Sequence, residues 1–531
     1  MSSRTKVATR GSRSLVTRGR AAVATLLVGS MAACAGGGDR DFGVAAGEAP
    51  TEITMDLRND VDTFDPMLTA ADQGAVQMYE AIYDTLVRRD IESGEYIPAM
   101  AESWEVTPTR VDFQLKETLT CADGTELTAD DVAASIERLA DPETGSIYTG
   151  RLFGSGGVAS IESDEQARTV SVEVEDPHTD LLDGFRNAFI VCPEGLADVE
   201  ALATEPQGTG PYRIASMSRG DTYVLERWDS PAVEDLAELP EKITMKVVTA
   251  DSTRANLYET GASDIAAILG RDANRLASDA EPIKGKAYQA DSLMFNQRDG
   301  YPLADENLRR AIALAVDAQE YTQAASFGVG EPADTVITSN MDCYTPENAE
   351  IGLKHDPAAA AAALEEAGYG PGGEQLTLRL VGYDVQNSGP DYIADALRKL
   401  GIEVEVTNGT QAQAAGIVYG DQEPWDLVVF PFLSAAPHPY PLVTKMSSNL
   451  GEGGAYNFGR VRNPDFDRLA DQAPGATGDE RCRLWGEAEA ALLERTDLKP
   501  LLWPVADYFA NGLTFQTEYR TIDLRTIRTE G

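Results

Sequence analysis

The stretch "VDFQLKETLTCADGTELTADDVAASIERL", Val111 to Leu139, contains the patterns of a strand and of a helix in succession. Apolar and polar residues alternate in "VDFQL", which predicts a half-buried strand. "TADDVAASIERLA" opens with Thr128, whose hydroxyl can accept a hydrogen bond from a free N–H group at a helix start. Acidic residues in the next turn support this prediction, because they lie at the positive end of the helix dipole.

The same alternation of strand and helix patterns extends over most of the chain. Further strands are predicted at 52–58, 169–175, 241–248, 402–407 and 425–430. Helices are predicted at 71–89, 251–262, 303–325, 356–370 and 389–401. This order favours α/β layers with largely parallel sheets. A chain of 531 residues corresponds to about three folding units.

The N-terminal segment 1–33 has the pattern of a secretory signal peptide. It carries six basic residues and no acid, and it ends in the apolar run "AAVATLLVGSMAA", Ala21 to Ala33. That run is shorter than the roughly 20 residues that a membrane-spanning helix needs.

Cys34 follows in "SMAAC", which resembles the lipobox of bacterial lipoproteins, with Met31 where leucine is most common. The resemblance implies cleavage before Cys34 and lipid attachment to its thiol. Residues 34–50 are rich in glycine and alanine and are predicted to form a flexible tether.

The chain is strongly acidic. It has 44 basic and 87 acidic residues, and loss of six basic residues with the signal peptide changes the formal charge from −43 to −49. Nucleic-acid binding needs a basic surface, so this composition argues against it. Solubility or salt adaptation is the simplest explanation of the charge, and cationic ligands are compatible with it.

Four cysteines remain after Cys34, an even number that suggests two disulfides in an exported protein. Three pairings are possible. We favour Cys121–Cys192 and Cys343–Cys482, because each pair then lies within one predicted domain. None has the CxxC spacing of metal or thioredoxin-like sites.

Sequence motifs of common enzymes are missing. The chain has no HExxH, no GxxxxGK[ST] and no GxSxG, and it contains only three histidines. No catalytic residue, metal ligand or cofactor is predicted from these observations.

Several segments resemble the family 5 solute-binding proteins of bacterial ABC importers, which bind oligopeptides, dipeptides or nickel. Val111 to Leu139 resembles the family pattern "FxLRxGxxFxDGxPxTAxDV". The other matching segments, in chain order, are "TFDPM" (63–67), "GTGPYRI" (208–214), "LYETGASDIA" (257–266), "LMFNQ" (293–297), "ENLRRAIALAVD" (306–317) and "KHDPAAAAAALEEAGY" (354–369).

The resemblance implies an α/β clamp of two lobes with mixed sheets flanked by helices, and an extra subdomain inserted in lobe I. By motif order, lobe I comprises 51–85, 205–285 and 505–531. The inserted subdomain comprises 86–204, and lobe II comprises 286–504. "GTGPYRI" marks the return to lobe I, and we interpret its glycines as structural.

The loop "FPFLSAAPHPYPLV", Phe430 to Val443, corresponds by order to a family segment that faces the ligand cleft. In peptide binders of the family, an aspartate there pairs with the α-amine of the ligand. This chain has no acid between Asp426 and Glu452, and His438 stands near the expected position. A buried ammonium needs a partner charge, so the usual amine anchor is absent or is supplied elsewhere.

Aromatic side chains could replace that anchor by stacking on the ligand. Phe430 is expected to belong to the core, whereas Phe432 and Tyr440 fit either role. Strand ends supply further candidates, because ligands of open α/β sheets gather at carboxyl ends of strands. The predicted ligand-binding residues are Asn59, Asp62, Phe295, Asn296, Tyr383, Asp384, Phe432, Ser434, His438 and Tyr440. Asp65-Pro66 is expected to fix a turn.

The resemblance implies a lipid-anchored, extracytoplasmic binding protein that captures a peptide or peptide-like ligand and delivers it to an ABC permease and its ATPase. It implies a monomer without enzyme activity. The alternatives are a binding protein for a glycan, haem, a siderophore or a nickel chelate, an exported hydrolase, and an envelope scaffold.

Overall fold

The computed structural model describes residues 47–531 with short gaps at 69–72, 92, 147, 155, 179, 232, 234–235, 371–372, 421–423, 434–436, 449–456, 519–520 and 531. The predicted signal peptide and Cys34 lie outside the described residues. The predicted tether is described only from Gly47, whose backbone N–H donates to the carbonyl of Thr529, 2.9 Å away. The end of this segment is therefore joined to the C-terminal residues.

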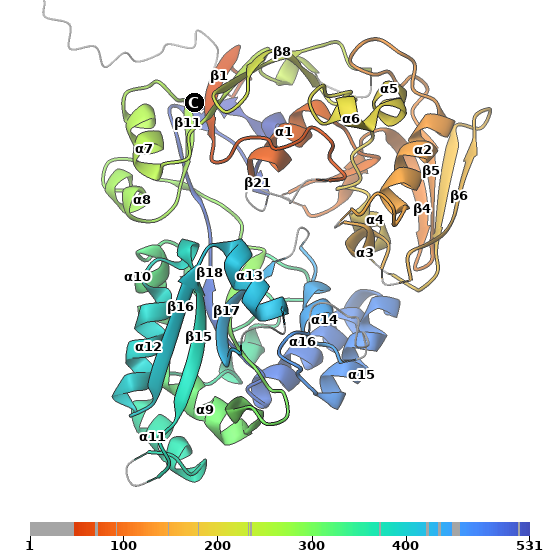
Figure 1. The fold of residues 1–531 in the computed structure, drawn as a ribbon. Coiled ribbons are helices and arrows are strands. Elements are labelled where there is room, and N and C mark those ends of the chain that lie inside the picture. The colour runs from red at the N-terminus through yellow and green to blue at the C-terminus, as the bar shows by residue number, and fades with distance from the viewer. Residues whose placement is uncertain are drawn as a thin grey trace, which may run out of the picture. The chain divides into compact units, whose positions relative to one another are not determined.

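A seven-stranded sheet forms the first lobe (Figure 1). Its strands, in spatial order, are β12 (Ile283–Lys284), β19 (Asp507–Ala510), β11 (Ile265–Ile268), β1 (Glu52–Leu57), β10 (Lys242–Val247), β9 (Thr222–Arg227) and β8 (Tyr212–Ser218). Helices of this lobe are α1 (Gln73–Ile82), α7 (Asp251–Glu259) and α8 (Arg271–Leu276).

A six-stranded sheet forms the second lobe. Its strands, in spatial order, are β14 (Glu331–Pro332), β18 (Leu498–Trp503), β13 (Gln289–Phe295), β17 (Leu427–Leu433), β15 (Thr377–Tyr383) and β16 (Glu403–Gly409). Its helices are α9 (Glu306–Ala315), α10 (Ala318–Ser326), α11 (Pro357–Glu366), α12 (Gly389–Lys399), α13 (Gln411–Tyr419), α14 (Pro441–Met446), α15 (Pro464–Gln472) and α16 (Gly478–Glu494).

Both sheets are mixed, as the family resemblance implies, whereas the prediction of largely parallel sheets from the order of local patterns is wrong. In the first lobe, β1 pairs in parallel with β10 and β11, and the remaining neighbours are antiparallel. In the second lobe, β15 pairs in parallel with β16 and β17. Hairpin partners such as β8 and β9, and strands that return from distant parts of the chain, add the antiparallel pairs, which local patterns do not reveal.

A separate four-stranded antiparallel sheet lies between α1 and β8 in the sequence. Its strands, in spatial order, are β4 (Ala101–Thr107), β5 (Arg110–Leu115), β7 (Thr169–Val174) and β6 (Val158–Asp164). The associated helices are α2 (Ala129–Ala140), α3 (Thr149–Leu152), α4 (Leu181–Gly184), α5 (Pro193–Ala197) and α6 (Val199–Leu202). Short strand pairs β2 (Val87–Arg89) with β3 (Tyr96–Pro98), β20 (Leu513–Thr514) with β23 (Arg528–Thr529), and β21 (Thr517–Glu518) with β22 (Thr521–Ile522) complete the fold. We call β2–β7 and α2–α6 the inserted subdomain; the domain boundaries stay predictions.

Helix α2 begins as the sequence predicts. The Thr128 hydroxyl accepts from the Asp131 N–H, and the Asp131 carboxylate accepts from the Thr128 N–H. This capping box satisfies two donors at the helix start, and a single cap of this kind contributes about 1 kcal/mol.

Two predicted helices are shorter than expected. The pattern at 71–89 forms a helix only to Ile82, because the Asp84 N–H donates to the Thr209 hydroxyl and the chain then enters β2. The pattern at 303–325 is broken at Asp317, whose carboxylate caps α10 by accepting from Gln319 and Glu320. An aspartate inside an amphipathic pattern is thus a helix start in this chain.

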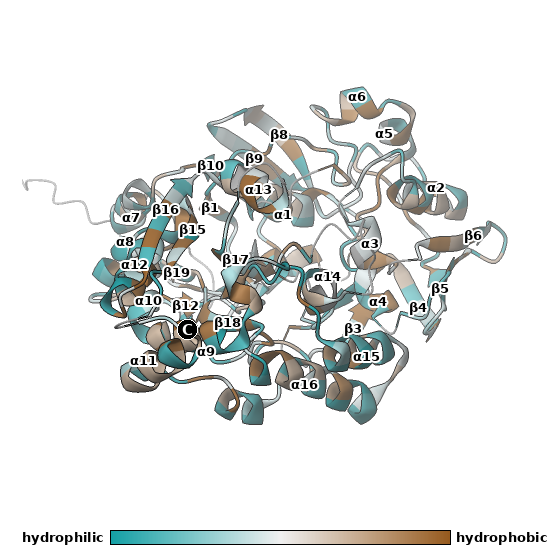
Figure 2. Cartoon of the chain, turned by 60° about the horizontal axis from the view of Figure 1, so that its bottom comes forward, coloured by the Kyte–Doolittle hydropathy of each residue, from teal (hydrophilic) through white to brown (hydrophobic). Residues whose placement is uncertain are grey.

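The core of the second lobe lies on both faces of its sheet. Leu293 and Phe295 of β13 pack with α9–α12, whereas Met294 belongs to the cluster on the other face, with α15 and α16. Successive side chains of a strand point to opposite faces of the sheet, so a strand with a continuous apolar run is buried on both faces. Figure 2 shows apolar residues on β15 and β18 and a mixture of apolar and hydrophilic residues on α16.

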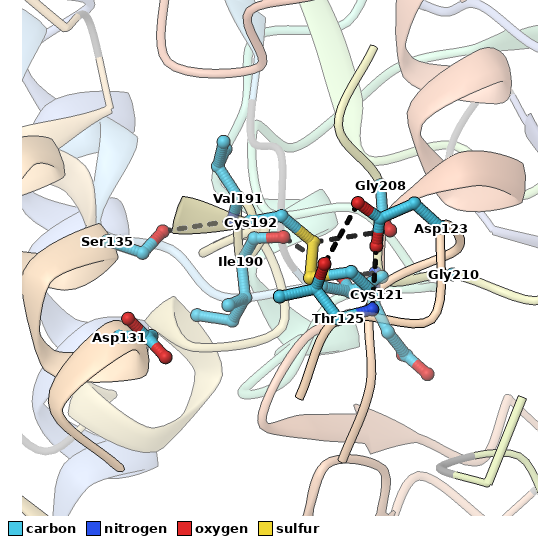
Figure 3. Close-up of a disulfide and its surroundings, with 12 residues drawn as sticks. Cys121, Asp123, Thr125, Asp131, Ser135, Ile190, Val191, Cys192, Gly208 and Gly210 are labelled. Atoms are coloured by element: carbon cyan, nitrogen blue, oxygen red, sulfur yellow. Dashed lines mark hydrogen bonds between the residues drawn. A yellow bond between two sulfur atoms is a disulfide. The ribbon is translucent and has the colours of Figure 1, made fainter. Parts of the chain in front are cut away.

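The structure contains the two favoured disulfides, Cys121–Cys192 and Cys343–Cys482. The first lies beside the "GTGPYRI" segment, where the N–H of Ala122 donates to the carbonyl of Gly208 (Figure 3). It therefore fixes the point at which the chain leaves the inserted subdomain.

The glycines of "GTGPYRI" are structural. A Cβ at Gly208 would lie 2.0 Å from the carbonyl oxygen of Ile82, and one at Gly210 would lie 2.7 Å from the N atom of Tyr83. The segment thus packs directly on the backbone at the end of α1.

We predict that Gly208→Ala lowers the free energy of unfolding by about 1–3 kcal/mol or more, because the methyl group has no space. Chemical denaturation monitored by circular dichroism measures this change. Gly416→Ala is the control, since a Cβ there meets nothing within 4 Å and the residue lies inside α13. It should stabilise by about 0.5–1 kcal/mol. Equal stability of the two variants would contradict the close packing at Gly208.

Candidate functional site

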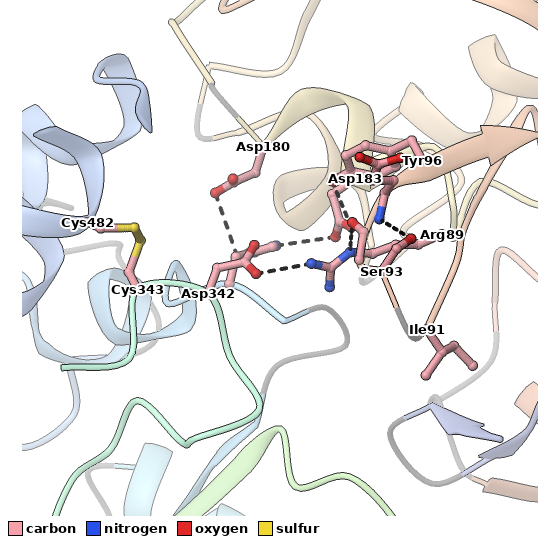
Figure 4. Close-up of polar contacts among 12 residues, drawn as sticks. Arg89, Ile91, Ser93, Tyr96, Asp180, Asp183, Asp342, Cys343 and Cys482 are labelled. Atoms are coloured by element: carbon pink, nitrogen blue, oxygen red, sulfur yellow. Dashed lines mark hydrogen bonds and ion pairs between the residues drawn. A yellow bond between two sulfur atoms is a disulfide. The ribbon is translucent and has the colours of Figure 1, made fainter. Parts of the chain in front are cut away.

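Polar contacts join the inserted subdomain to the second lobe (Figure 4). Arg481 of α16 forms an ion pair with Asp180, which precedes α4. Arg89 of β2 donates to Asp342 over 3.1 Å. The Nζ of Lys286, between β12 and β13, donates to the carbonyl of Ile91 over 2.8 Å. The lobes therefore meet along a charged boundary.

His438 lies at the same boundary. Its Nδ1 is 3.9 Å from a carboxylate oxygen of Asp180, and its Nε2 is 3.8 Å from Oδ2 of Asp183. Burial would raise the pKa of Asp180, but the charges of His438 and Arg481 hold it below its ordinary value. The acids that face the predicted aromatic loop thus come from the other lobe.

Arg186 links Asp183 to the C-terminal hairpin. It donates to Oδ1 of Asp183 and to Oε1 of Glu518, each over 2.6 Å, and the Tyr96 hydroxyl also donates to Asp183 over 3.2 Å. Burial would lower the pKa of Arg186, yet the two carboxylates raise it, so the guanidinium stays charged.

A pocket opens on the first lobe next to these contacts. It is formed by the end of α1, strand β2, Arg186 and the hairpin β21–β22. Its polar lining consists mainly of four arginines and four acids: Arg88, Arg89, Arg186, Arg525, Glu80, Asp84, Glu518 and Asp523. A wall of this composition can bind charged groups of a solute.

Glu80 is an unusual member of this lining. Burial among the pocket residues, with smaller contributions from the charges of Asp523 and Glu518, raises its pKa to about 8. One carboxyl oxygen accepts a hydrogen bond from the Thr521 hydroxyl over 2.9 Å. Glu80 is therefore mostly protonated at neutral pH.

The aromatic loop is largely buried. Phe430 and Phe432 belong to the core cluster of the second lobe, so the structure supports the expected core position of Phe430. The Lys445 Nζ lies 5.7 and 5.6 Å from the centres of their rings. Tyr440 is 7% exposed, and its ring centre lies 5.3 Å from that of His178 in the inserted subdomain.

Other predicted site residues lie away from the pocket. Phe295 is completely buried in the core, and the side chain of Asn296 donates to the carbonyl of Trp425. Their burial gives no support to ligand contact. Asn59 and Asp62 are exposed beyond β1, and the Asp62 carboxylate accepts from the Thr63 N–H.

The remaining candidates are Tyr383, Asp384 and Ser434. Tyr383 is 5% exposed and packs edge-on against Phe430, with ring centres 6.4 Å apart. Asp384 begins the short 3₁₀ helix Asp384–Gln386, and its side chain lies outside the described part. Ser434 also lies outside the described residues. The ligand contacts of all these residues stay predictions.

Sequence reasoning missed the residues that form the pocket and the boundary. Asp180, Asp183 and Arg186 lie in a segment without a recognised motif, and Arg88 lies in a stretch interpreted as helix. The pair Arg88-Arg89 in a very acidic chain was the available signal. Its proximity to Glu518, Asp523 and Arg525 is a property of the tertiary structure.

Asp65 fixes a turn, as expected. Its carboxylate accepts from the Met67 N–H over 3.0 Å and pairs with Arg138 of α2. The residue is completely buried, so its role here is structural.

Within the described residues, no group of three or more histidine, cysteine, aspartate or glutamate side chains is placed to hold a metal ion. The helices found in the described residues are also too short or too polar to cross a membrane.

Stability should depend on the protonation of Glu80. The pKa in the folded state, about 8, exceeds the ordinary value of 4.5. Between these values the unfolded chain has lost a proton that the folded protein keeps, so stability falls as pH rises. Glu489, with a pKa raised to about 7 by burial, acts in the same direction. We predict that the Tm of Glu80→Gln falls less between about pH 5 and pH 8 than the Tm of the wild type does.

Differential scanning calorimetry at several pH values measures this effect. Glu403→Gln, at an exposed position of β16, is the control and should keep the pH dependence of the wild type. An unchanged pH dependence in Glu80→Gln would show that Glu80 is ionised in the folded protein.

Comparison with known proteins gives consistent matches over almost the whole chain. Protein XP55 of Streptomyces lividans is 28% identical, over 98% of this chain and 96% of its own length. The periplasmic murein peptide-binding protein MppA of Escherichia coli (strain K12) is 24% identical, over 85% of this chain and 87% of its own.

A crystal structure of a substrate-binding protein from Microbacterium hydrocarbonoxydans, complexed with 4-hydroxybenzoate hydrazide, is also similar. It has a TM-score of 0.71 and 28% identity, and the match covers 90% of this chain and 100% of the other. The fold is that of two-lobed periplasmic binding proteins. The sequence model of the family "Bacterial extracellular solute-binding proteins, family 5 Middle" matches residues 95–454. The chain belongs to family 5 of the bacterial extracellular solute-binding proteins.

Proposed function

We propose that this protein is the lipid-anchored solute-binding component of an ABC importer, and that it holds a peptide or peptide-like solute between its lobes for delivery to the permease and ATPase. The observation that carries the proposal is the charged boundary between the lobes beside an open, charged pocket. Contacts that form only when two lobes meet can enclose a solute and signal the closed state to a partner.

The relatives support a role in binding. MppA is named for a murein peptide, and the chain belongs to a family of binding proteins. We therefore propose an extracytoplasmic monomer without catalytic activity.

A non-peptide solute is the second candidate. His438 stands near the position where peptide binders have an acid, and the acids nearest to it, Asp180 and Asp183, already pair with Arg481 and Arg186. The similar Microbacterium protein was crystallised with a hydrazide. An amine anchor for peptides is thus not evident among the described residues of the boundary.

Native mass spectrometry of the protein purified from its own host tests solute binding. We expect a bound small molecule that fragmentation identifies as a peptide, a peptide-like compound or another solute. Chemical conversion of that molecule by the purified protein would contradict a pure binding function.

Loss of the contact between Arg481 and Asp180 should weaken solute binding. We predict that Arg481→Ala lowers the affinity for the identified solute about tenfold, because a charged hydrogen bond contributes about 1.5 kcal/mol or more. Arg483→Ala is the matched control, since Arg483 of the same helix pairs only with Glu480 and Glu487 among the described residues. Isothermal titration calorimetry measures both. Equal affinities would mean that the Arg481 contact does not contribute to the bound state.

The anchor rests on Cys34. We predict that Cys34→Ser moves the protein from the membrane fraction to the soluble extracytoplasmic fraction. Stable attachment needs more than one acyl chain, and the two sites of acylation, the thiol and the new α-amine, both belong to this cysteine. Immunoblots of cell fractions measure the distribution. Met31→Leu should remain in the membrane fraction, and membrane retention of a Cys34→Ser chain that has lost residues 1–33 would exclude a lipid on this residue.

A further inference from the structure

Arg88 lies at the centre of β2 (Val87–Arg89), and it lines the pocket on the first lobe. Its side chain is half-buried. Among the residues that the structure describes, its guanidinium group forms no hydrogen bond and no ion pair. Loss of solvation, together with the charge of Arg525, lowers the pKa of Arg88 to about 10, so it remains charged at neutral pH. An incoming anion would stabilise such a group.

The other arginines of the pocket already have partners. Arg89 pairs with Asp342 over 3.1 Å, Arg186 pairs with Glu518 over 2.6 Å, and Arg525 pairs with Asp84 over 3.4 Å. These pairs engage three guanidinium groups, whereas Arg88 has no such carboxylate partner in the described lining.

The acids of the pocket limit the charge of that solute. Asp84, Glu518 and Asp523 line the same wall, and a ligand with two negative charges would be repelled by their carboxylates. Glu80 does not add to this repulsion, because it is mostly protonated at neutral pH. The wall is therefore suited to a single negative charge.

We propose that this pocket receives one carboxylate group of the solute and that Arg88 is the residue that binds it. The inference rests on the proposed function, because it treats the pocket as part of the solute site. A planar guanidinium matches a carboxylate with two parallel hydrogen bonds, so a small organic acid or a peptide C-terminus fits the site. The solute is then held by its acidic end, and no aspartate is required for an amine.

Isothermal titration of the full chain in detergent tests this with two probes of the same shape, sodium benzoate and neutral benzamide. We expect benzoate to bind about tenfold more tightly or better, since hydrogen bonds to a charged group are about twice as strong as neutral ones. Equal binding of the two probes, or binding of neither, would overturn the proposal, and this comparison needs no variant.

Arg88→Gln should lower the affinity for benzoate to that for benzamide. Arg88→Lys keeps the charge but loses the planar fork, and it should retain part of the affinity. Arg213→Gln is the matched control, because Arg213 is an exposed residue of β8 in the same lobe and does not line the pocket. Wild-type affinity of Arg88→Gln for benzoate, with the fold verified by circular dichroism, would exclude Arg88.

A second pair of probes distinguishes the two sources of the carboxylate. Tighter binding of glycyl-phenylalanine than of 3-phenylpropionate would indicate a peptide C-terminus, and the reverse would indicate an organic acid; both results support the proposal. A co-purified solute without a carboxylate would overturn it and leave the proposed transport function intact.

Discussion

The two large sheets depend on two chain segments that pass side by side from one lobe to the other. One leads from β12 to β13 and the other from β18 to β19. The N–H of Gly285 donates to the carbonyl of Ala506 over 2.9 Å, and Lys284 pairs with Asp507 over 2.7 Å. A Cβ at Gly285 would lie 3.1 Å from the oxygen of the same carbonyl, so a larger residue would require the paired segments to shift by a few tenths of an ångström. Because these two segments pair, β12 lies next to β19 in the first sheet and β13 lies next to β18 in the second.

The second disulfide holds in place two residues that make contacts at the boundary between the lobes. Cys343 follows Asp342, and Cys482 follows Arg481, so their bond holds side by side the two residues that contact Arg89 and Asp180. The two contact residues come from segments 139 positions apart. A covalent link between such segments keeps both charged groups in place, which makes the boundary a defined surface.

Net charge and local charge differ in this protein. The chain as a whole is strongly acidic, yet four arginines line the pocket of the first lobe. Net charge governs solubility and long-range attraction, whereas binding depends on the few groups that face the solute. Three of the four arginines have carboxylate partners, and the proposal of a site for one negative charge rests on this arrangement, not on the number of arginines.

The sequence by itself determined much of the local structure, and it determined the family. Thr128 predicts the start of α2, the pattern at 356–370 predicts α11, and the ordered motifs predict a two-lobed binding protein. It also predicted the disulfides, because each pair lies within one part of the chain. Caps, turns and periodicity depend on neighbouring residues, so one sequence is sufficient for them.

Only the tertiary structure decided the composition of the candidate site. The helix pattern at 71–89 ends at Ile82 because Thr209, far along the chain, binds Asp84. That early end places Arg88 in strand β2, which lines the pocket together with Glu518, Asp523 and Arg525. Phe295 and Phe432, by contrast, lie in the core of the second lobe. Contacts between distant segments are set by how whole sheets and helices pack, and no local pattern encodes which charged side chains will meet.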